Sequence, residues 1–280
     1  MTHIARRFLQ TLEPIVTSVL MMPPEVTEEM SAIGIADPIA GYVTARAAPL
    51  GRVSAATATA VFYNWSPAVI ERSLRFDLAE PEVVLGARGR AAARTHERLI
   101  GLDAPGLDDA LALLRRVTDA CRPEGRPLFA GNAALPWPEH PLEALWHGGN
   151  LLREFRGDGH IAVLVAHGLS GPAAFVMNMA YTRWSRDFFY GLRGWPEEVY
   201  RAAHEDLVAR GFFSDAGDLT DAGLKFKEMI EVETDRAATA PLDALGADAG
   251  RLLELLAPLG ERVYERKGLH PSSARIARVD

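Results

Sequence analysis

The stretch "AHGLSGPAA" at residues 166–174 breaks a long apolar segment with two glycines and a proline. A second string, "AIGIADPIA" at 32–40, has Ala, Gly, Pro and Ala at the same places, with Ile35 opposite Leu169. The offset of 134 residues (166 minus 32) is close to half of the 280-residue chain. Gly and Pro at such places mark turns, so both strings predict the same turn between two buried helices.

The similarity extends beyond these strings with the element order preserved. At the same offset Glu13 falls on His147, and "SAATATAVFYNWSP" aligns with the helix that follows Pro196. Apolar residues spaced three and four apart predict helices along most of the chain. We predict a mainly α fold of two pseudo-symmetric winged-helix-like repeats. The alternative is that Gly–Pro turns between helices recur by accident.

The segment "RPEGRPLFAGNAALPWPEHP" at 122–141 is rich in Pro and Gly and is predicted to connect the two repeats across the surface. The first repeat then spans 1–121 and is degenerate, because nothing resembling a wing follows its helix-turn-helix region. The second repeat spans 142–280 and carries a small β-wing near 212–220.

Composition excludes several classes of protein. A net charge of −7 and a pI near 5.7 argue against attraction of the whole protein to nucleic acid or to an anionic membrane. The single cysteine, Cys121, excludes an internal disulfide and fits a reducing compartment. Residues 1–22 are interpreted as an amphipathic helix rather than a signal peptide, and 159–181 is too interrupted to span a membrane. A cytoplasmic location without a membrane partner is therefore expected.

The second half carries a family resemblance in "LVARGFF", "SDAGD" and "LTDAG", which run together from 207 to 223. This resembles the winged helix-turn-helix of MarR-like proteins, with Gly211 ending a helix, Phe212 and Phe213 starting a strand, and Thr220 capping the next helix. The chain also resembles an actinobacterial helix-turn-helix family of unassigned activity through "LEPI", "ARAAPLG", "FYNW" and "REFRGDGH". MarR-like subunits are about half as long and dimeric, so the resemblance implies a fused pseudo-dimer.

A MarR-like regulator would place the helix after Pro196 in the DNA major groove. Its exposed positions would include Glu197, Glu198 and Glu205, and the wing "SDAGD" is acidic as well. Such a face repels phosphates, so DNA is a possible but disfavoured partner. The residues that would contact DNA in this alternative are Arg201, His204 and Arg210.

The sequence has no phosphate-binding loop, dinucleotide fingerprint, HExxH motif or nucleophile elbow, so we expect no cofactor and no metal site. A polar cluster, "WHGGNLLREFRGDGH" at 146–160, remains. In one interpretation it is a capped helix junction, with Asp158 starting a new helix. In the other it faces a cleft between the repeats that binds a small molecule. The ligand-binding candidates are Tyr42, Arg46, Asn64, Trp146, Arg153, Glu154 and Asp158.

Three hypotheses for function therefore stay open. The first is a small-molecule-binding protein on a duplicated winged-helix scaffold. Its catalytic extension is a cofactor-independent acid–base enzyme of specialised metabolism, performing an elimination, cyclisation or isomerisation with Glu13, His147 and His160. The second is a ligand-responsive MarR-like transcriptional regulator that binds DNA. The third is a non-catalytic scaffold for a partner chain.

Overall fold

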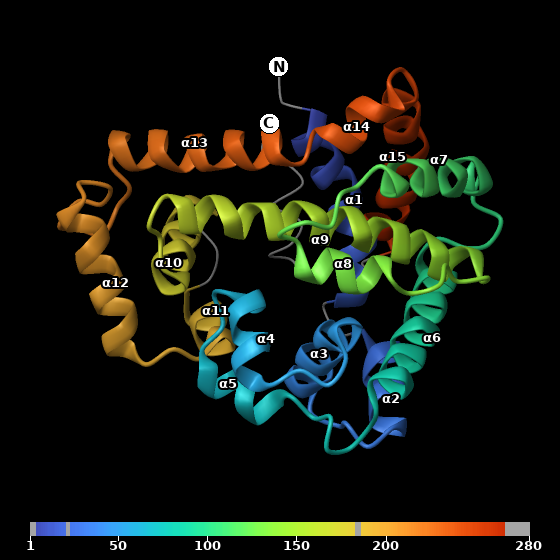
Figure 1. Cartoon of the computed structure of the whole chain (residues 1–280), viewed down its shortest axis with the longest axis horizontal. Helices are drawn as coiled ribbons and strands as arrows, with labels where there is room; N and C mark the ends of the chain where they lie inside the picture. The colour runs from blue at the N-terminus through green and yellow to red at the C-terminus, as the bar shows by residue number, and fades with distance from the viewer. Residues whose placement is uncertain (1–3, 21–22, 183–185, 267–280) are drawn as a thin grey trace.

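The computed structural model describes residues 4–20, 23–182 and 186–266. Within these ranges the chain forms fifteen α-helices, one short 3-10 helix and no β-strand, which confirms a mainly α fold. Figure 1 shows the helices arranged around one long central helix, α9. That helix packs against α1, α6, α7, α8 and α13, so it joins elements from both ends of the chain.

The helices before the central one are α1 (Ile4–Leu20), α2 (Pro24–Ala32), α3 (Pro38–Ala47), η1 (Ala48–Leu50), α4 (Ala55–Phe62), α5 (Pro67–Ser73), α6 (Pro81–Leu99), α7 (Leu107–Asp119) and α8 (Pro127–Ala133). From the central helix onward they are α9 (Pro141–Ala166), α10 (Gly171–Thr182), α11 (Arg186–Arg193), α12 (Glu197–Ala209), α13 (Asp221–Ala237), α14 (Ala240–Leu245) and α15 (Asp248–Glu265).

The apolar core has three parts. One lies between α1, α7, α9 and α15, a second between α2, α3, α5 and α6, and a third between α10, α12 and α13. Two adjacent glycines let other elements approach α9 closely: a Cβ at Gly148 would lie 2.9 Å from Trp137, and one at Gly149 would lie 3.0 Å from Val16. The "GG" of the polar cluster therefore serves helix packing.

The predicted turn is confirmed in both places. Gly34 and Gly168 each adopt a positive φ, of 89° and 66°, directly after a helix. Ile35 N–H then donates to the Met30 carbonyl (2.9 Å), and Leu169 N–H donates to the Leu164 carbonyl (3.0 Å). These are the same helix-ending bonds, and both following side chains are buried. The two strings therefore encode one local structure twice.

The predicted β-wing is corrected to a turn. Among the described residues the hairpin consists of one antiparallel bridge, between Phe213 and Leu219. Thr220 N–H donates to the Phe212 carbonyl at 3.0 Å, and the arms are too short for a strand. The flanking predictions hold, because Gly211 has a φ of 75° and Thr220 accepts a hydrogen bond from the first turn of α13.

Two predictions about burial are wrong. The segment 122–141 does not merely cover the surface, because it forms α8 and places Phe129 in the core with 2 % of its surface exposed. The helix α4 has no charged residue, a composition that predicts a buried helix, yet it exposes Ala56, Thr57 and Ala60. Small uncharged side chains are compatible with either environment, which explains why composition misled here.

No single helix in the described ranges is long and apolar enough to cross a membrane. The pair α9 and α10 passes such a test only jointly, and the chain bends by 109° between the two helices.

The predicted helix junction at Asp158 is also wrong, because α9 continues without a break from Pro141 to Ala166. Asp158 points from this helix to α8, where its Oδ2 accepts a hydrogen bond from Phe129 N–H at 2.9 Å. Position 159 of this helix is a glycine, and the Arg126 guanidinium occupies the space that a Cβ would need. A Cβ at this position would lie 2.6 Å from Arg126 Nη1. The "RGDGH" sequence therefore binds α8 and its preceding turn to α9.

Asp158 provides a pH-dependent test of this contact. Burial raises the pKa of its carboxyl to about 6, so the folded state favours the protonated form. The stability contributed by protonation is complete below the ordinary pKa near 4 and is lost as the pH rises through about 6. We expect Asp158→Asn to leave the free energy of unfolding unchanged or higher at pH 7.5, because the amide oxygen still accepts from Phe129.

The matched variant Asp158→Ala lacks any acceptor and should be less stable than Asp158→Asn by about 1 kcal/mol. Urea unfolding at pH 7.5 and pH 5 measures both differences. The advantage of the amide over the wild type should shrink at pH 5, where the wild-type carboxyl is protonated. A marked loss of stability in Asp158→Asn at pH 7.5 would show that the negative charge is required.

Candidate functional site

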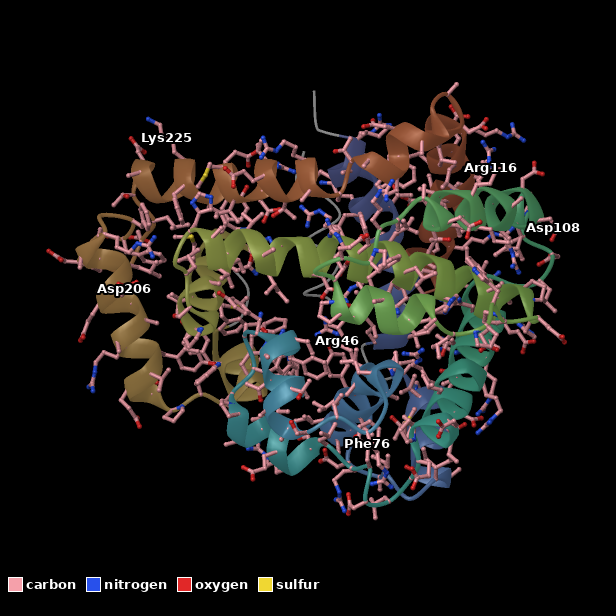
Figure 2. The ribbon with its side chains drawn as sticks, in the orientation of Figure 1. Arg46, Phe76, Asp108, Arg116, Asp206 and Lys225 are labelled. Atoms are coloured by element: carbon pink, nitrogen blue, oxygen red, sulfur yellow. The ribbon has the colours of Figure 1, made fainter. Side chains whose placement is uncertain are left out.

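A cavity lies between α1, α2, α3, α6, α8 and α9, with a volume of about 480 Å³ including the part open to solvent. Four predicted ligand-binding residues line it: Tyr42, Arg46, Trp146 and Glu154. Figure 2 shows Arg46 near the centre of the molecule, below α9. The remaining lining residues are Val19, Leu20, Val26, Met30, Gly41, Ala45, Arg88, Asn132 and Asn150.

Arg46 and Glu154 form a two-pronged ion pair at this cavity. Arg46 Nε lies 3.1 Å from Glu154 Oε1, and Nη2 lies 2.9 Å from Oε2. The Glu154 side chain is only 2 % exposed, and that of Arg46 is 15 % exposed. Burial alone would raise the pKa of Glu154, but the guanidinium groups of Arg46 and Arg153 hold it below its ordinary value. Both partners are therefore charged, and each neutralises the other.

Arg88 is different, because no carboxylate in the described part of the chain lies within ion-pair distance of its buried guanidinium. It comes from α6 and is 8 % exposed. Its guanidinium donates to the Ala45 carbonyl at 3.2 Å and lies 5.0 Å from the centre of the Trp146 ring. Among the described residues no Asp or Glu forms an ion pair with it. Burial lowers the pKa of Arg88 to about 10, although Glu154 and Glu143 oppose that shift.

The remaining walls combine amides with aromatic and apolar surface. Asn150 donates to the Asn132 side-chain oxygen at 3.3 Å, and Asn132 donates to the Leu128 carbonyl at 2.8 Å. Trp146 Nε1 donates to the Val16 carbonyl at 3.4 Å, so its only polar atom is already bonded. These bonds fix the side chains in place before any ligand arrives.

The lining carries a positive balance within an acidic protein. Two arginines, Arg46 and Arg88, face the cavity against one glutamate, Glu154, while the whole chain has a net charge of −7. A buried cation without a partner is energetically costly, and a ligand that supplies the counter-charge recovers that cost. The cavity is therefore suited to an anion.

The sequence did not identify Arg88, Asn132 or Asn150. "GARGRA" at 86–91 is too weak a pattern to predict phosphate binding. A usable signal was present, however, because Arg88 shares a helix face with Val84, Ala91 and Ala92, all of which are buried. An arginine on an otherwise apolar face indicates a buried guanidinium.

Besides Asp158, which accepts from Phe129 N–H, two other predicted ligand residues lie outside the cavity lining. The Asn64 carbonyl accepts a hydrogen bond from Trp195 Nε1 at 3.0 Å, in the contact between two turns. Arg153 binds Glu154 at 3.1 Å from the far side and lies 4.0 Å from Glu13. Neither lines the cavity of Arg88.

The three catalytic candidates are not brought together. Glu13 lines a separate apolar groove, where burial raises its pKa against the opposing charges of Arg153 and Arg156. His147 packs edge-on against Trp137, with ring centres 5.1 Å apart, and its buried Nε2 has no hydrogen-bond partner in the described part of the chain. Burial lowers its pKa to about 4.

His160 lies in a third place, beside α13. Its Nδ1 lies 2.9 Å from Thr234 Oγ1, and burial lowers its pKa to about 4. It lines a small pocket with Lys227, whose ammonium is paired with Glu231. Across the described ranges no group of three or more His, Cys, Asp and Glu residues is placed to hold a metal ion.

Of the three residues predicted to contact DNA, Arg210 and His204 are engaged within the protein, whereas Arg201 stays exposed. Arg201 lies 4.0 Å from Glu205. Arg210 donates to the His167 and Gly168 carbonyls, which ties α12 to the turn before α10. His204 packs on Phe213 at 5.3 Å between ring centres.

The outer face of α12 is acidic. It exposes Glu197, Glu198, Glu205 and Asp206, with Arg201 as the single exposed cation of the helix. Figure 2 shows Asp206 at the edge of the molecule.

The arrangement of α11 and α12 defines the class of protein. The two helices are joined by a short turn, Gly194–Pro196, in which Gly194 has a φ of 65°. Two helices joined by a short glycine-containing turn form a helix-turn-helix motif. The chain belongs to a helix-turn-helix family, whose model matches residues 5–270. Comparison with curated proteins and with solved structures gives no significant match.

Proposed function

We propose that this helix-turn-helix protein binds a small organic anion in the cavity of Arg46 and Arg88. The observation that carries the proposal is Arg88, a buried guanidinium that lines the cavity and has no carboxylate partner among the described residues. Arg46 is already neutralised by Glu154, so it positions the ligand more than it supplies charge. A carboxylate placed on Arg88 gains charge-assisted hydrogen bonds in a poorly solvated site.

The rest of the lining favours a planar apolar body on that anion. Tyr42 and Trp146 contribute aromatic surface, and Val26 and Met30 contribute aliphatic surface. Ligand cavities with such apolar walls and a few fixed polar groups commonly bury most of a small molecule. Aromatic carboxylates therefore match the site in both charge and shape.

Benzoate and its uncharged analogue benzamide test the proposal directly. The two probes have nearly the same size, so their difference reports the need for a negative charge. Trp146 lines the cavity, so ligand binding should change tryptophan fluorescence. Saturable binding of benzoate with much weaker binding of benzamide supports the proposal. Equal affinities, or no binding of benzoate, contradict it.

The scaffold that we propose is an internal duplication of a MarR-like unit. Packing in the two halves supports this: α2 packs on α6 as α9 packs on α13, and α3 packs on α5 as α10 packs on α12. By this criterion α5 corresponds to α12, so the sequence alignment of α4 with α12 is shifted by one helix. The boundaries 1–121, 122–141 and 142–280 and the actinobacterial origin remain predictions.

The catalytic extension remains a prediction with less support. Acid–base catalysis requires its groups within hydrogen-bond reach of one substrate, whereas Glu13, His147 and His160 lie in three separate environments. The proposed role in specialised metabolism is therefore supported by the proposed ligand binding and not by an arrangement of catalytic groups.

DNA binding is the second candidate function, and membership of a helix-turn-helix family favours it. Two observations oppose it. The outer face of α12 is acidic, and the turn of the α11–α12 motif contacts the turn between α4 and α5, the corresponding pair of helices in the proposed first repeat. Ser66 N–H donates to the Arg193 carbonyl at 3.0 Å, and Trp195 Nε1 donates to the Asn64 carbonyl at 3.0 Å. Dimeric regulators instead hold their recognition helices about one turn of DNA apart, roughly 34 Å.

We expect mixed-sequence duplex DNA to show no binding to the protein even at low salt. The physical reason is that an acidic helix face gains nothing from displacing counterions on the phosphates. Fluorescence anisotropy of labelled DNA at low and at physiological salt measures this. Binding that weakens steeply with salt and is lost in Arg201→Gln would instead establish the regulator hypothesis.

A further inference from the structure

Arg193, at the end of α11, is a second guanidinium without a carboxylate partner among the described residues. Its Cζ lies 4.5 Å from the centre of the Trp65 ring and 5.4 Å from that of Phe175. Its Nε is buried and has no hydrogen-bond partner in the described part of the chain. Aromatic rings stabilise a guanidinium but do not neutralise it, so this charge lacks a counter-ion.

Arg193 does not line the proposed anion cavity, but two stacked rings connect it to the cavity wall. Trp65 stacks on Tyr42, with ring centres 5.5 Å apart and planes inclined by 22°, and Tyr42 lines the cavity. Burial lowers the pKa of Arg193 to about 10, with the positive charges of Arg46 and Arg153 contributing to the shift and Tyr42 and Tyr200 opposing it. Arg193 is therefore close enough to Arg46, at the cavity, to be repelled by it.

We infer that Arg193 is a second specificity-determining residue of this cavity, and that the preferred ligand carries two anionic groups. This inference rests on the proposed function. One carboxylate binds at Arg88, and the second lies toward Arg193, where it offsets the repulsion between Arg193 and Arg46. The substrate class narrows from organic anions to planar dianions such as aromatic dicarboxylates.

The position of Arg193 also links the ligand to the helix-turn-helix motifs. Its carbonyl accepts the hydrogen bond from Ser66 N–H, and the next residue, Gly194, lies against Val69, where a Cβ would be only 2.3 Å from a side-chain methyl. A dianion that binds Arg193 therefore stabilises the contact between the turn before α5 and the turn before α12.

The test compares benzoate with benzene-1,3- and benzene-1,4-dicarboxylate by calorimetry. The wild type should bind at least one dicarboxylate at least tenfold more tightly than benzoate. Arg193→Gln should lose that preference, and Arg193→Lys, which keeps the charge, should retain part of it. The matched control is Arg115→Gln, which removes an exposed arginine that stacks on Trp137 (4.4 Å) and does not line the cavity. It should bind all probes as the wild type does.

The outcomes separate the two proposals. Failure of benzoate and of both dicarboxylates to bind contradicts the proposed function itself. If benzoate binds and neither dicarboxylate binds more tightly, only the role of Arg193 is overturned. The same holds if Arg193→Gln still prefers a dicarboxylate to benzoate. If Arg193→Gln does not fold, by circular dichroism, the wild-type comparison and Arg193→Lys still decide the question.

Discussion

Replacing Glu154 with glutamine is expected to lower the free energy of unfolding by about 3 kcal/mol, because it leaves Arg46 buried without a counter-charge. The carboxylate is 2 % exposed and holds Arg46 through two hydrogen bonds of 3.1 and 2.9 Å. Its pKa lies below the ordinary value, so this contribution is complete above the ordinary pKa and is lost only as the pH falls through the lower, folded-state pKa. Urea unfolding at neutral pH measures the loss.

Two control variants separate the ion pair from general disruption. Arg153 is the other partner of Glu154, and its side chain is 25 % exposed. Arg153→Gln should therefore lower the free energy of unfolding by no more than about 1 kcal/mol. The double variant Arg46→Met with Glu154→Gln removes both charges, so it should be more stable than Glu154→Gln alone. A double variant that is less stable than Glu154→Gln would show that Arg46 stabilises the fold without its partner.

Replacing Arg88 with methionine is expected to remove most of the affinity for benzoate without destabilising the protein. The loss should be about 2–4 kcal/mol, or roughly 30- to 900-fold in Kd, as for removal of one member of a buried charge pair. Methionine keeps the apolar stem between Trp146 and α3 while the buried unpaired charge disappears. The free energy of unfolding should therefore stay the same or rise.

Arg90→Met is the matched control, because Arg90 lies on the same helix but is exposed and paired with Glu29 at 2.8 Å. It should bind benzoate as the wild type does. If Arg88→Met bound benzoate normally, Arg88 would not be the anion contact. If it were strongly destabilised, Arg88 would have a structural role that its hydrogen bond to the Ala45 carbonyl, at 3.2 Å, does not explain.

The sequence predicted the class of fold and part of the cavity, for identifiable reasons. The repeated turns at 32–40 and 166–174 are local structures, set by a glycine after a helix and an apolar residue next to it, so they can be recognised without knowing the fold. Tyr42 and Arg46 were identified because they lie one turn apart on a single helix. The apolar face of α6 indicates that Arg88 is buried, but the convergence of α3 and α6 on the same cavity is tertiary and has no local pattern in the sequence.

The errors have a common physical origin. "RGDGH" at 156–160 has the composition of a turn, yet α9 continues through it because Arg126 and α8 pack on its small residues. The "SAATATAVFY" segment has no charge, yet it forms a helix, α4, that exposes Ala56, Thr57 and Ala60, because small uncharged residues fit both exposed and buried positions. In both places packing against a distant segment, rather than local preference, decided the structure.

The most direct test of the central claim is a crystal structure of the protein with 4-bromobenzoate, in which anomalous scattering locates the bromine. We expect one bromine in the cavity lined by Tyr42, Met30 and Trp146, with the carboxylate within hydrogen-bond distance of the Arg88 guanidinium. We also expect the Arg46–Glu154 pair to stay intact. Bromine bound only elsewhere, or an empty cavity at a concentration that saturates binding in solution, would contradict the account.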